Sequence, residues 1–231
     1  MNSSNMSVTI NMAMTLDGKI SSYDGSNLSF GSKEDRQEMD RLRAETDIII
    51  WGAETLRIAN CTAKVREQKF IDHRIEQGKP PQPASSVITR TGNIPKRCNW
   101  FESELAQFVF TGINGKEKAR DCCEGRAEVI VSPTEEVSPS AVIDFLKKKN
   151  FRKVLLECGG TVHWSFIKEN LVDSLYITVT PFLAGGSNSP TILDGEGFLG
   201  PDFVNLELEK FEKKGHELFL KYNVLKKNRF K

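Results

Sequence analysis

The segment LLECGGTVHWSF (155–166) combines an apolar run that ends on an acid, a pair of glycines and the start of a helical pattern. The run KVLLE (153–157) predicts a buried strand, and the spacing of Val162 and Phe166 predicts a helix after the glycines. Glycines permit a tight turn and a close approach to a ligand, and the exposed N–H groups of a helix start favour a phosphate. Plain turn chemistry explains such a pair more often, and the dinucleotide fingerprint G-x-G-x-x-G is absent from the chain. The segment therefore predicts one strand–turn–helix unit of an α/β sheet.

Further strands and helices are indicated along the chain. Alternating or continuous apolar residues predict strands at 8–14, 47–51, 86–90, 107–111, 127–131, 174–182, 206–211 and 217–225. Ser32 and Ser138 are predicted helix N-caps, the first for a helix that runs to about Arg43. Strands separated by helices indicate a parallel sheet, whereas the last two strands form a hairpin that turns at Lys214-Gly215. The predicted fold is α/β, with a mostly parallel central sheet, helices on both faces and an antiparallel C-terminal hairpin.

The proline-rich segment EQGKPPQPAS (76–85) could mark a linker between domains. The next predicted strand follows it at once, so a surface loop inside one domain is the better interpretation. The whole chain, 1–231, is therefore predicted to form a single domain.

The composition limits the classes of partner. The 231 residues include 32 basic and 31 acidic ones, which gives a net charge of +1. A protein that binds nucleic acid or a membrane surface usually has a basic excess or stripe, so neither partner is expected. No apolar run reaches the roughly 18 residues of a membrane span, and the N-terminus has no signal-peptide pattern. Five irregularly spaced cysteines and three single histidines predict neither a disulfide framework nor a metal site, and reduced thiols in the cytoplasm are the expectation.

Three polar clusters have residue types suited to a ligand. Lys19 follows a predicted Asp17-Gly18 turn, and a turn with a solvated lysine explains this pattern as well. Thr55 lies where a helix is expected to begin, so it could cap that helix or contact a ligand phosphate. The triplet TRT (89–91) ends a strand and suits a phosphomonoester such as the 2′-phosphate of NADP, but a hydrophilic strand end is about equally good as an explanation.

Taken together and in order, these motifs resemble the reductase family of riboflavin biosynthesis. This family forms the C-terminal half of a bacterial deaminase–reductase, also occurs as a separate protein, and shares the fold of dihydrofolate reductase. The segments that carry the resemblance are MAMTLDGKIS (12–21), LRAETDIIIWGAETL (42–56), PPQPASSVITRTGNI (80–94), VLLECGGTVHWSFIKENLVDSLYITVTPFLAGG (154–186) and DGEGF (194–198). They span most of the chain, and the fourth is the most specific. No zinc-deaminase signature (H-x-E with P-C-x-x-C) is present, so the resemblance is to the reductase alone.

The resemblance implies NADPH-dependent reduction of a ribosylaminopyrimidine 5′-phosphate to its ribitylamino product, with hydride transfer to C1′ of the sugar. It implies a site for the cofactor pyrophosphate at the glycine pair and a site for the 2′-phosphate at residues 89–91. The residues assigned in this way to the cofactor are Gly52, Thr55, Thr89, Arg90, Thr91, Gly159, Gly160 and Thr161. Those assigned to the substrate are Asn11, Asp17, Arg43 and Arg66, with Arg43 at the 5′-phosphate and Arg66 as a second phosphate contact. A homodimer is implied as well.

Lys19 and Glu157 match family positions that face the ribose, which makes them the expected catalytic residues. The glycosylamine ring must open to a C=N group whose cationic form accepts hydride. The ammonium of Lys19 can donate a proton to the departing ring oxygen or polarise the sugar, and the carboxylate of Glu157 can stabilise the iminium charge or relay a proton. The cofactor supplies the hydride, and the protein supplies orientation and an electric field.

One departure from the family concerns the substrate. The family carries an acid and a proline shortly after the position of Thr55, whereas this chain has Ala59, Asn60 and Cys61 there. Either the same substrate is handled differently, or the fold and NADPH serve another small substrate, such as a pterin or another carbonyl or imine compound. A nucleotide-binding module without turnover is the alternative from a different class. The sequence leaves open whether the diaminated or the deaminated pyrimidine is used.

Overall fold

The structure, a computed structural model, describes residues 6–25, 30–59, 62–102 and 105–226. The chain divides into two compact units. Unit 1 comprises Gln37–Cys158 with Met1–Met6, and unit 2 comprises Ser7–Arg36 with Gly159–Lys231. Unit 1 is thus almost one continuous piece of sequence, whereas unit 2 combines segments from both ends of the chain. No helix within the described ranges is long and apolar enough to cross a membrane.

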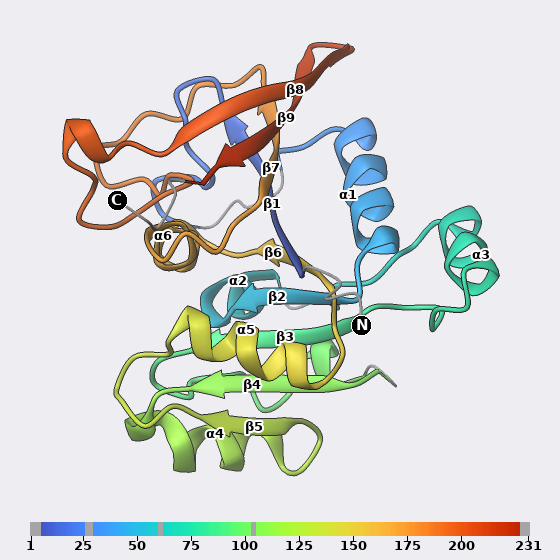
Figure 1. The fold of residues 1–231 in the computed structure, drawn as a ribbon, viewed down its shortest axis with the longest axis vertical. Helices are drawn as coiled ribbons and strands as arrows, with labels where there is room; N and C mark the ends of the chain where they lie inside the picture. The colour runs from blue at the N-terminus through green and yellow to red at the C-terminus, as the bar shows by residue number, and fades with distance from the viewer. Residues whose placement is uncertain (1–5, 26–29, 60–61, 103–104, 227–231) are drawn as a thin grey trace. The chain divides into compact units, whose positions relative to one another are not determined.

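The described part of unit 1 has a sheet of five parallel strands in the order β5-β4-β3-β2-β6 (Figure 1). The strands are β2 Ile48–Gly52, β3 Ala84–Thr89, β4 Gln107–Thr111, β5 Glu128–Val131 and β6 Lys153–Glu157. Every residue of β2 and β4 is buried, because strands inside a parallel sheet are covered on both faces. The short apolar runs that predicted buried strands are therefore confirmed as such.

Helical segments cover both faces of this sheet. The helical segments of unit 1 are α2 Ala53–Ala59, α3 Gln68–Glu76, η1 Asn99–Glu102, η2 Ile113–Gly115, α4 Lys116–Cys123 and α5 Pro139–Lys148. α5 crosses one face, where the ring of Phe145 contacts that of Phe108 in β4 (Figure 1). η1 lies on the other face, where Trp100 donates a hydrogen bond of 2.8 Å to Ser85. Ser85 precedes Ser86, the residue level with Phe108, so its side chain leaves the sheet on the opposite face.

Unit 2 has a smaller, mixed sheet. In the order of the sheet, its described strands are β1 Ser7–Thr15, β7 Ser174–Thr180, β9 Glu217–Leu225 and β8 Asn205–Lys214, and its helical segments are α6 Gly160–Lys168 and η3 Gly200–Asp202. β1 and β7 are parallel, whereas β9 runs antiparallel to both β7 and β8 (Figure 1). The hairpin turns at Gly215, whose φ of 59° favours glycine, so the predicted C-terminal hairpin is confirmed. A β-bulge between Leu208 and Lys210 keeps Leu206, Leu208 and Phe211 on one face of β8.

The helix α1 (Lys33–Glu45) begins at its predicted cap. The N–H of Asp35 donates to Oγ of Ser32 at 3.1 Å, which satisfies one of the donors left over at a helix start. Ser32 in turn donates its N–H and its hydroxyl to the carboxylate of Glu217 at the start of β9, at 3.0 and 2.5 Å. Within unit 2, two residues 185 positions apart in the sequence are thereby joined.

Some strand ends differ from the predicted ones. β3 ends at Thr89, so Arg90 lies just beyond it. β7 ends at Thr180, before the predicted end at 182, because Pro181 has no N–H for the ladder. β8 is longer than its predicted range of 206–211. The proline-rich segment connects α3 to β3 inside unit 1, so its interpretation as a loop rather than a linker is confirmed.

Candidate active site

The carboxyl ends of the parallel strands in unit 1 bring several predicted residues to one edge of that sheet. Gly52 ends β2, Thr89 ends β3 and Glu157 ends β6. The strand register puts Trp51 level with Glu157, and Gly52 level with Ile88. Open parallel sheets bind their ligands at this edge, so these residues occupy a position suited to function.

Glu157 is surrounded by N–H donors. Its carboxylate accepts hydrogen bonds from Nε of Arg43 (2.9 Å), Nη2 of Arg43 (2.6 Å) and Nε1 of Trp51 (3.1 Å). The side chains of Arg43 and Glu157 are only 4% and 9% exposed, so the ion pair is nearly enclosed. A two-pronged guanidinium fixes the plane of a carboxylate, and these charge-assisted bonds offset the loss of hydration. The protein itself therefore holds Glu157 in one orientation.

The guanidinium of Arg43 is used inside the protein. Besides its bonds to Glu157, its Nη1 donates to the carbonyl oxygen of Lys64 at 3.0 Å. The contact of Arg43 with a substrate phosphate, which the family resemblance implies, stays a prediction. Sequence reasoning missed both this ion pair and the role of Trp51. The one available signal was that Trp51 and Glu157 each end a predicted strand, so their side chains meet if those strands are neighbours.

Cys158 follows Glu157 but has no nucleophilic character. Its Sγ donates to the carbonyl oxygen of Ile50 at 3.1 Å, and the residue is 1% exposed. Burial, and then the neighbouring charge of Glu157, raise the pKa of the Cys158 thiol far above its ordinary value. A neutral thiol is a poor nucleophile, so Cys158 contributes packing rather than chemistry.

The residues assigned to the nucleotide in unit 1 differ in exposure, because Arg90 and Thr91 are exposed, Thr55 is half-buried, and Gly52 and Thr89 are buried. Thr55 is the third residue of α2, and its side chain has no hydrogen bond to another described residue, so the explanation of Thr55 as a helix cap is wrong. Arg90 has a side chain 63% exposed and an ion pair of 3.6 Å with Glu136, which at this exposure adds little stability. Thr89 is buried, whereas Thr91 is exposed. Thr55 and Arg90 therefore keep polar groups that a ligand can use.

Of the three residues that depart from the family pattern, Ala59 is the last residue of α2. Asn60 and Cys61 lie outside the residues that the structure describes. The replacement of the family acid is therefore known from the sequence, and the structure does not describe its surroundings.

Arg66 lies between α2 and α3, and Asp40 of α1 holds the backbone there. The N–H groups of Arg66 and Glu67 donate to Oδ2 of Asp40 at 2.8 and 3.0 Å. Asp40 is 2% exposed, and its Oδ1 has no hydrogen-bond partner among the described residues. The exposed side chain of Arg66 makes no hydrogen bond or ion pair within the described part of the chain. Arg66 is thus an unpaired cation on an anchored backbone, and Asp40 is a residue that sequence reasoning missed.

In unit 2, the two glycines at the start of α6 meet different surroundings. A Cβ on Gly160 would lie 2.4 Å from the carbonyl oxygen of Thr191 and 2.5 Å from Oδ2 of Asp194, so packing requires glycine there. Gly159 has an ordinary φ of −78° and open space where a side chain would be. Gly159 at the N-cap has no side chain to cap α6, and no side-chain cap of this helix is found in the described part of the chain. Packing explains Gly160, whereas Gly159 leaves room for a ligand beside the exposed Thr161.

Lys19 lies after the turn that ends β1. Its Nζ donates to the carbonyl oxygen of Ser189 at 3.3 Å, and no other hydrogen bond of this ammonium is found among the described residues. Asn11, by contrast, lies in the middle of β1, level with Tyr176 and away from the strand end. Lys19 therefore keeps donors for a substrate, and the substrate role of Asn11 stays a prediction.

Asp17 anchors a neighbouring segment of unit 2. Its carboxylate accepts from the hydroxyl of Thr15 (2.6 Å) and from the N–H groups of Ala184 (3.0 Å) and Gly185 (2.7 Å). The Thr15 hydroxyl first, and then the two N–H groups, lower the pKa of Asp17 to about 2. Asp17 thus fixes the turn around Lys19, and its direct contact with a substrate stays a prediction.

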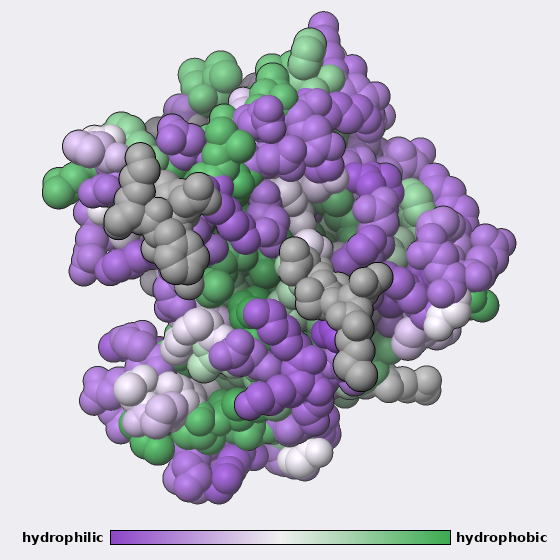
Figure 2. Space-filling model, viewed as in Figure 1, coloured by the Kyte–Doolittle hydropathy of each residue, from purple (hydrophilic) through white to green (hydrophobic). Residues whose placement is uncertain are grey.

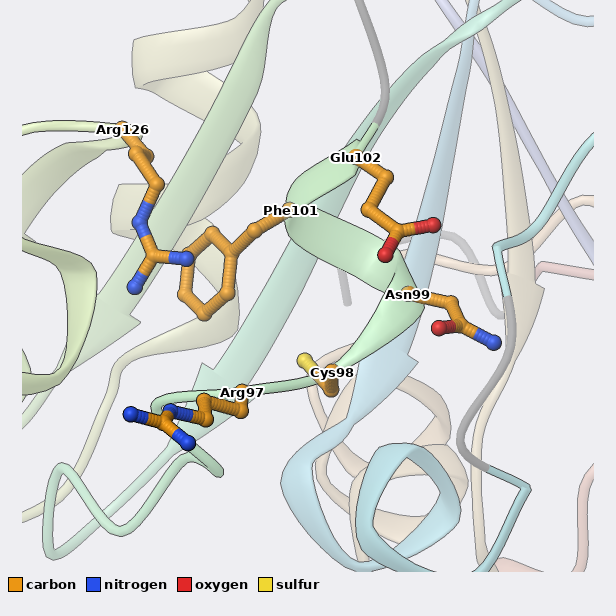
Figure 3. A pocket seen from close by; sticks show the side chains of 6 residues that line it. All are labelled: Arg97, Cys98, Asn99, Phe101, Glu102 and Arg126. Atoms are coloured by element: carbon orange, nitrogen blue, oxygen red, sulfur yellow. The ribbon is translucent and has the colours of Figure 1, made fainter.

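A cavity of about 380 Å³ lies in unit 1 beside η1 (Figure 3). Its lining residues are Arg97, Cys98, Asn99, Phe101, Glu102 and Arg126. The guanidinium of Arg126 lies 4.1 Å from the ring centroid of Phe101. It also donates to the carbonyl oxygen of Cys122, and so it satisfies one of the acceptors left over in the last turn of α4. None of the predicted site residues lines this cavity, which is therefore separate from the candidate site.

Comparisons with known proteins bear on the family. Residues 6–220 match the family model described as RibD C-terminal domain. The chain is 35% identical to the 2,5-diamino-6-ribosylamino-4(3H)-pyrimidinone 5′-phosphate reductase of Archaeoglobus fulgidus over 209 residues, which are 90% of this chain and 93% of the relative. It is 28% identical to the protein of that name from Methanothermobacter thermautotrophicus, over 94% of this chain and 97% of the relative. The crystal structure of a pyrimidine reductase-like protein from Corynebacterium diphtheriae has the same fold, with a TM-score of 0.83 at 22% identity, over 96% of this chain and 93% of that one. The family expected from the motifs is confirmed, and this chain belongs to the RibD C-terminal domain family.

Proposed function

We propose that this protein is an NADPH-dependent reductase of riboflavin biosynthesis, and that it reduces the ribosylamino group of 2,5-diamino-6-ribosylamino-4(3H)-pyrimidinone 5′-phosphate to ribitylamino. The class of enzyme follows from the family and from the names of its relatives. The observation that carries the proposal is the carboxylate of Glu157, held by Arg43 and Trp51 at the carboxyl end of β6. A fixed anion suits a reaction in which positive charge develops on the substrate.

The residues of the chain fit NADPH, which when bound would supply the hydride that C1′ accepts. In unit 2, the uncapped start of α6 and the open space at Gly159 suit the pyrophosphate, because N–H groups at a helix start attract an anion. In unit 1, the exposed guanidinium of Arg90 suits the 2′-phosphate, and the hydroxyl groups of Thr55 and Thr91 can add hydrogen bonds. The preference for NADPH over NADH would therefore rest on Arg90.

Lys19 would act as the proton donor. Its long hydrogen bond to Ser189, at 3.3 Å, leaves N–H donors that can turn to the ring oxygen of the sugar. Proton transfer to that oxygen opens the glycosylamine ring and leaves a cationic C=N group. The carboxylate of Glu157, already aligned by Arg43 and Trp51, would stabilise this cation.

Arg66 would hold the 5′-phosphate of the substrate. Its side chain is exposed and has no partner in the described part of the chain, while Asp40 fixes its backbone. Arginine binds a phosphate with two parallel hydrogen bonds, which gives orientation as well as affinity. Asp17 would support the same substrate indirectly, by fixing the turn that carries Lys19.

The proposed assembly is a homodimer. β8 lies at the edge of its sheet and exposes Leu206, Leu208 and Phe211 on one face, with Phe211 69% exposed. Apolar side chains reach the surface in the upper part of Figure 2, where Figure 1 draws β8 and β9. An exposed apolar strand edge invites pairing, and a second copy of the chain is the proposed cover. Light scattering should give the mass of a dimer, and Phe211→Asp should give a monomer; a wild-type monomer would contradict this assembly.

The proposed location is the cytoplasm. Four cysteines of the described residues, Cys98, Cys122, Cys123 and Cys158, are buried and form no disulfide. Buried cysteines without a disulfide are typical of proteins that work in a reducing compartment. Localisation of a fluorescent fusion would test this point.

The test of the function is a turnover assay with a defined substrate. Purified protein with NADPH and the diaminated pyrimidinone phosphate should consume the nicotinamide absorbance, and mass spectrometry should identify the ribitylamino product. The deaminated compound should react more slowly. Binding of NADPH without turnover of either compound would contradict the proposed reaction and favour a nucleotide-binding module. Turnover only with a pterin or another imine would keep the enzyme class and replace the substrate.

A further inference from the structure

The indole of Trp51 is buried against the carboxylate of Glu157. Trp51 is 3% exposed, and its Nε1 lies 3.1 Å from Oε2 of Glu157. The register of β2 and β6 makes the two residues direct neighbours, so both side chains leave the sheet on the same face. The indole N–H can only donate, and the packed ring fixes its direction. It therefore restricts the position of Oε2.

Arg43 restrains the same carboxylate from another side. Its Nε and Nη2 donate to Oε1 and Oε2 of Glu157 at 2.9 and 2.6 Å. Its Nη1 donates to the carbonyl oxygen of Lys64 at 3.0 Å. The side chain of Arg43 is 4% exposed, and loss of its guanidinium would leave a nearly buried carboxylate without its cation.

We infer that Trp51 and Arg43 are positioning residues for Glu157. The inference rests on the proposed function, in which Glu157 stabilises a cationic substrate. Orientation matters because the effect of a charge on the reacting group depends on their distance and alignment. With either neighbour changed, the carboxylate can turn away from its working position. The consequence is a loss of kcat with little change in the binding of substrate or NADPH.

Trp51→Phe tests the inference, and Trp100→Phe is its matched control. Both changes remove a buried indole N–H and the same volume, because Trp100 is 0% exposed and donates to Ser85 at 2.8 Å. Trp51→Phe should lower kcat about tenfold at unchanged KM, the size expected for a hydrogen bond to a charged group. Trp100→Phe should lower the melting temperature and leave kcat at the wild-type value. A wild-type kcat in Trp51→Phe would overturn the role of Trp51.

Arg43→Lys separates positioning from phosphate binding, and it decides the point even if Trp51→Phe fails to fold. Lysine keeps the charge but loses the two-pronged geometry. The variant is assayed with the substrate and with its dephosphorylated form. Positioning of Glu157 lowers kcat for both compounds. An unchanged kcat for both compounds, with an increase of KM confined to the phosphorylated one, would overturn the positioning role of Arg43, and Arg66→Ala provides the reference for that pattern.

Glu157→Gln distinguishes failure of this inference from failure of the proposed function. Full activity of Glu157→Gln would remove the catalytic role of Glu157 and with it the proposed mechanism. Loss of activity in Glu157→Gln, together with full activity in Trp51→Phe and Arg43→Lys, would overturn the inference alone. In the Glu157→Gln background, Trp51→Phe should add little further loss, because no carboxylate remains to be oriented.

Discussion

Glu157 of unit 1 and Lys19 of unit 2 are the two expected catalytic residues, and their surroundings are opposite in kind. Glu157 receives N–H donors from Arg43 and Trp51, and its side chain is 9% exposed. Among the described residues, the ammonium of Lys19 has one long hydrogen bond, to the carbonyl oxygen of Ser189 at 3.3 Å, while the backbone N–H of Lys19 donates to the hydroxyl of Thr15. The protein therefore orients the anion in advance, whereas in the proposed function the ammonium would take its direction from the substrate. Activity should therefore depend more strongly on the neighbours of Glu157 than on the neighbours of Lys19.

The largest effect is expected for Lys19→Met. Loss of the proton donor should lower kcat roughly 10²- to 10⁴-fold, the range typical of general acid catalysis. The melting temperature and NADPH affinity should change little, because the ammonium has a single long bond. Steady-state kinetics and calorimetric titration of NADPH measure the two quantities.

Lys96→Met is the control for this change, because Lys96 is exposed and its ammonium pairs with Asp121 on the surface of the described part of the chain. It should keep wild-type kcat. If Lys19→Met kept more than about a tenth of the wild-type kcat, general acid catalysis by Lys19 would be excluded.

Arg90→Ala tests the proposed site for the 2′-phosphate of NADPH in unit 1. The dissociation constant of NADPH should rise about 10- to 100-fold, the loss expected for a charge-assisted contact with phosphate, while that of NADH stays constant. Stability should not change, because the ion pair with Glu136 is long and exposed. Arg97→Ala, at another exposed arginine of unit 1, is the control. Equal losses of affinity for NADPH and NADH would contradict the assignment of Arg90 to the 2′-phosphate.

Gly159→Ala and Gly160→Ala form a matched pair in unit 2. Gly159→Ala should keep the melting temperature, because its φ is ordinary and its side-chain position is open, yet weaken NADPH about tenfold by crowding the pyrophosphate. Gly160→Ala should destabilise the fold by about 1–3 kcal/mol, as expected for overpacking against Thr191 and Asp194. Unchanged NADPH affinity in Gly159→Ala would place the pyrophosphate elsewhere.

Asp40→Ala examines the segment that carries Arg66. Release of the two N–H groups should raise KM for the phosphorylated substrate about three- to tenfold, because the Arg66 backbone loses its anchor. Asp47→Ala is the control, since Asp47 accepts the N–H groups of Arg152 and Lys153 at 2.8 and 2.9 Å. It should lower the melting temperature without changing KM. The same KM in both variants would mean that Asp40 has only a structural role.

The smallest effect is expected for Asp17→Asn, and it depends on pH. The folded protein keeps the pKa of Asp17 at about 2, below the roughly 3.9 of an unfolded chain. The stability that Asp17 adds is therefore complete above about pH 5 and lost as the pH falls toward about 2. Thermal unfolding of wild type and Asp17→Asn should differ at neutral pH and converge in acid. A constant difference across this range would contradict the assignment.

Local patterns predicted most of the fold. The runs IIIW and FVF became fully buried strands, and Ser32 and Ser138 cap their helices through Asp35 and Ala141. These features depend on neighbours in sequence, whose preferences are visible without the fold. Thr55 was ambiguous because a cap differs from a third helical residue by only a small shift of the helix start.

The features that the sequence did not predict depend on contacts between segments that are distant in the chain. Arg43 and Glu157 are 114 positions apart, and no local pattern of either residue indicates the other. The division into two units was likewise out of reach, because it follows from which strands pair rather than from where strands occur. The sequence pattern did not distinguish the two glycines of the pair. In the structure, packing requires glycine at position 160, because a Cβ there would meet Thr191 and Asp194, which lie far along the chain.

The hydrogen bonds from Ser32 to Glu217 have a consequence for folding during synthesis on the ribosome. Residues 37–158 leave the ribosome as one stretch, so unit 1 can fold while synthesis continues. β1 and the cap of α1, although made earlier, lack β7 and Glu217 until nearly the whole chain has been translated. Such long-range pairing is slow and leaves a strand open to wrong partners. A chain stopped before residue 217 would contain β7 and every expected catalytic residue, yet it would lack the carboxylate that holds Ser32 at the cap of α1.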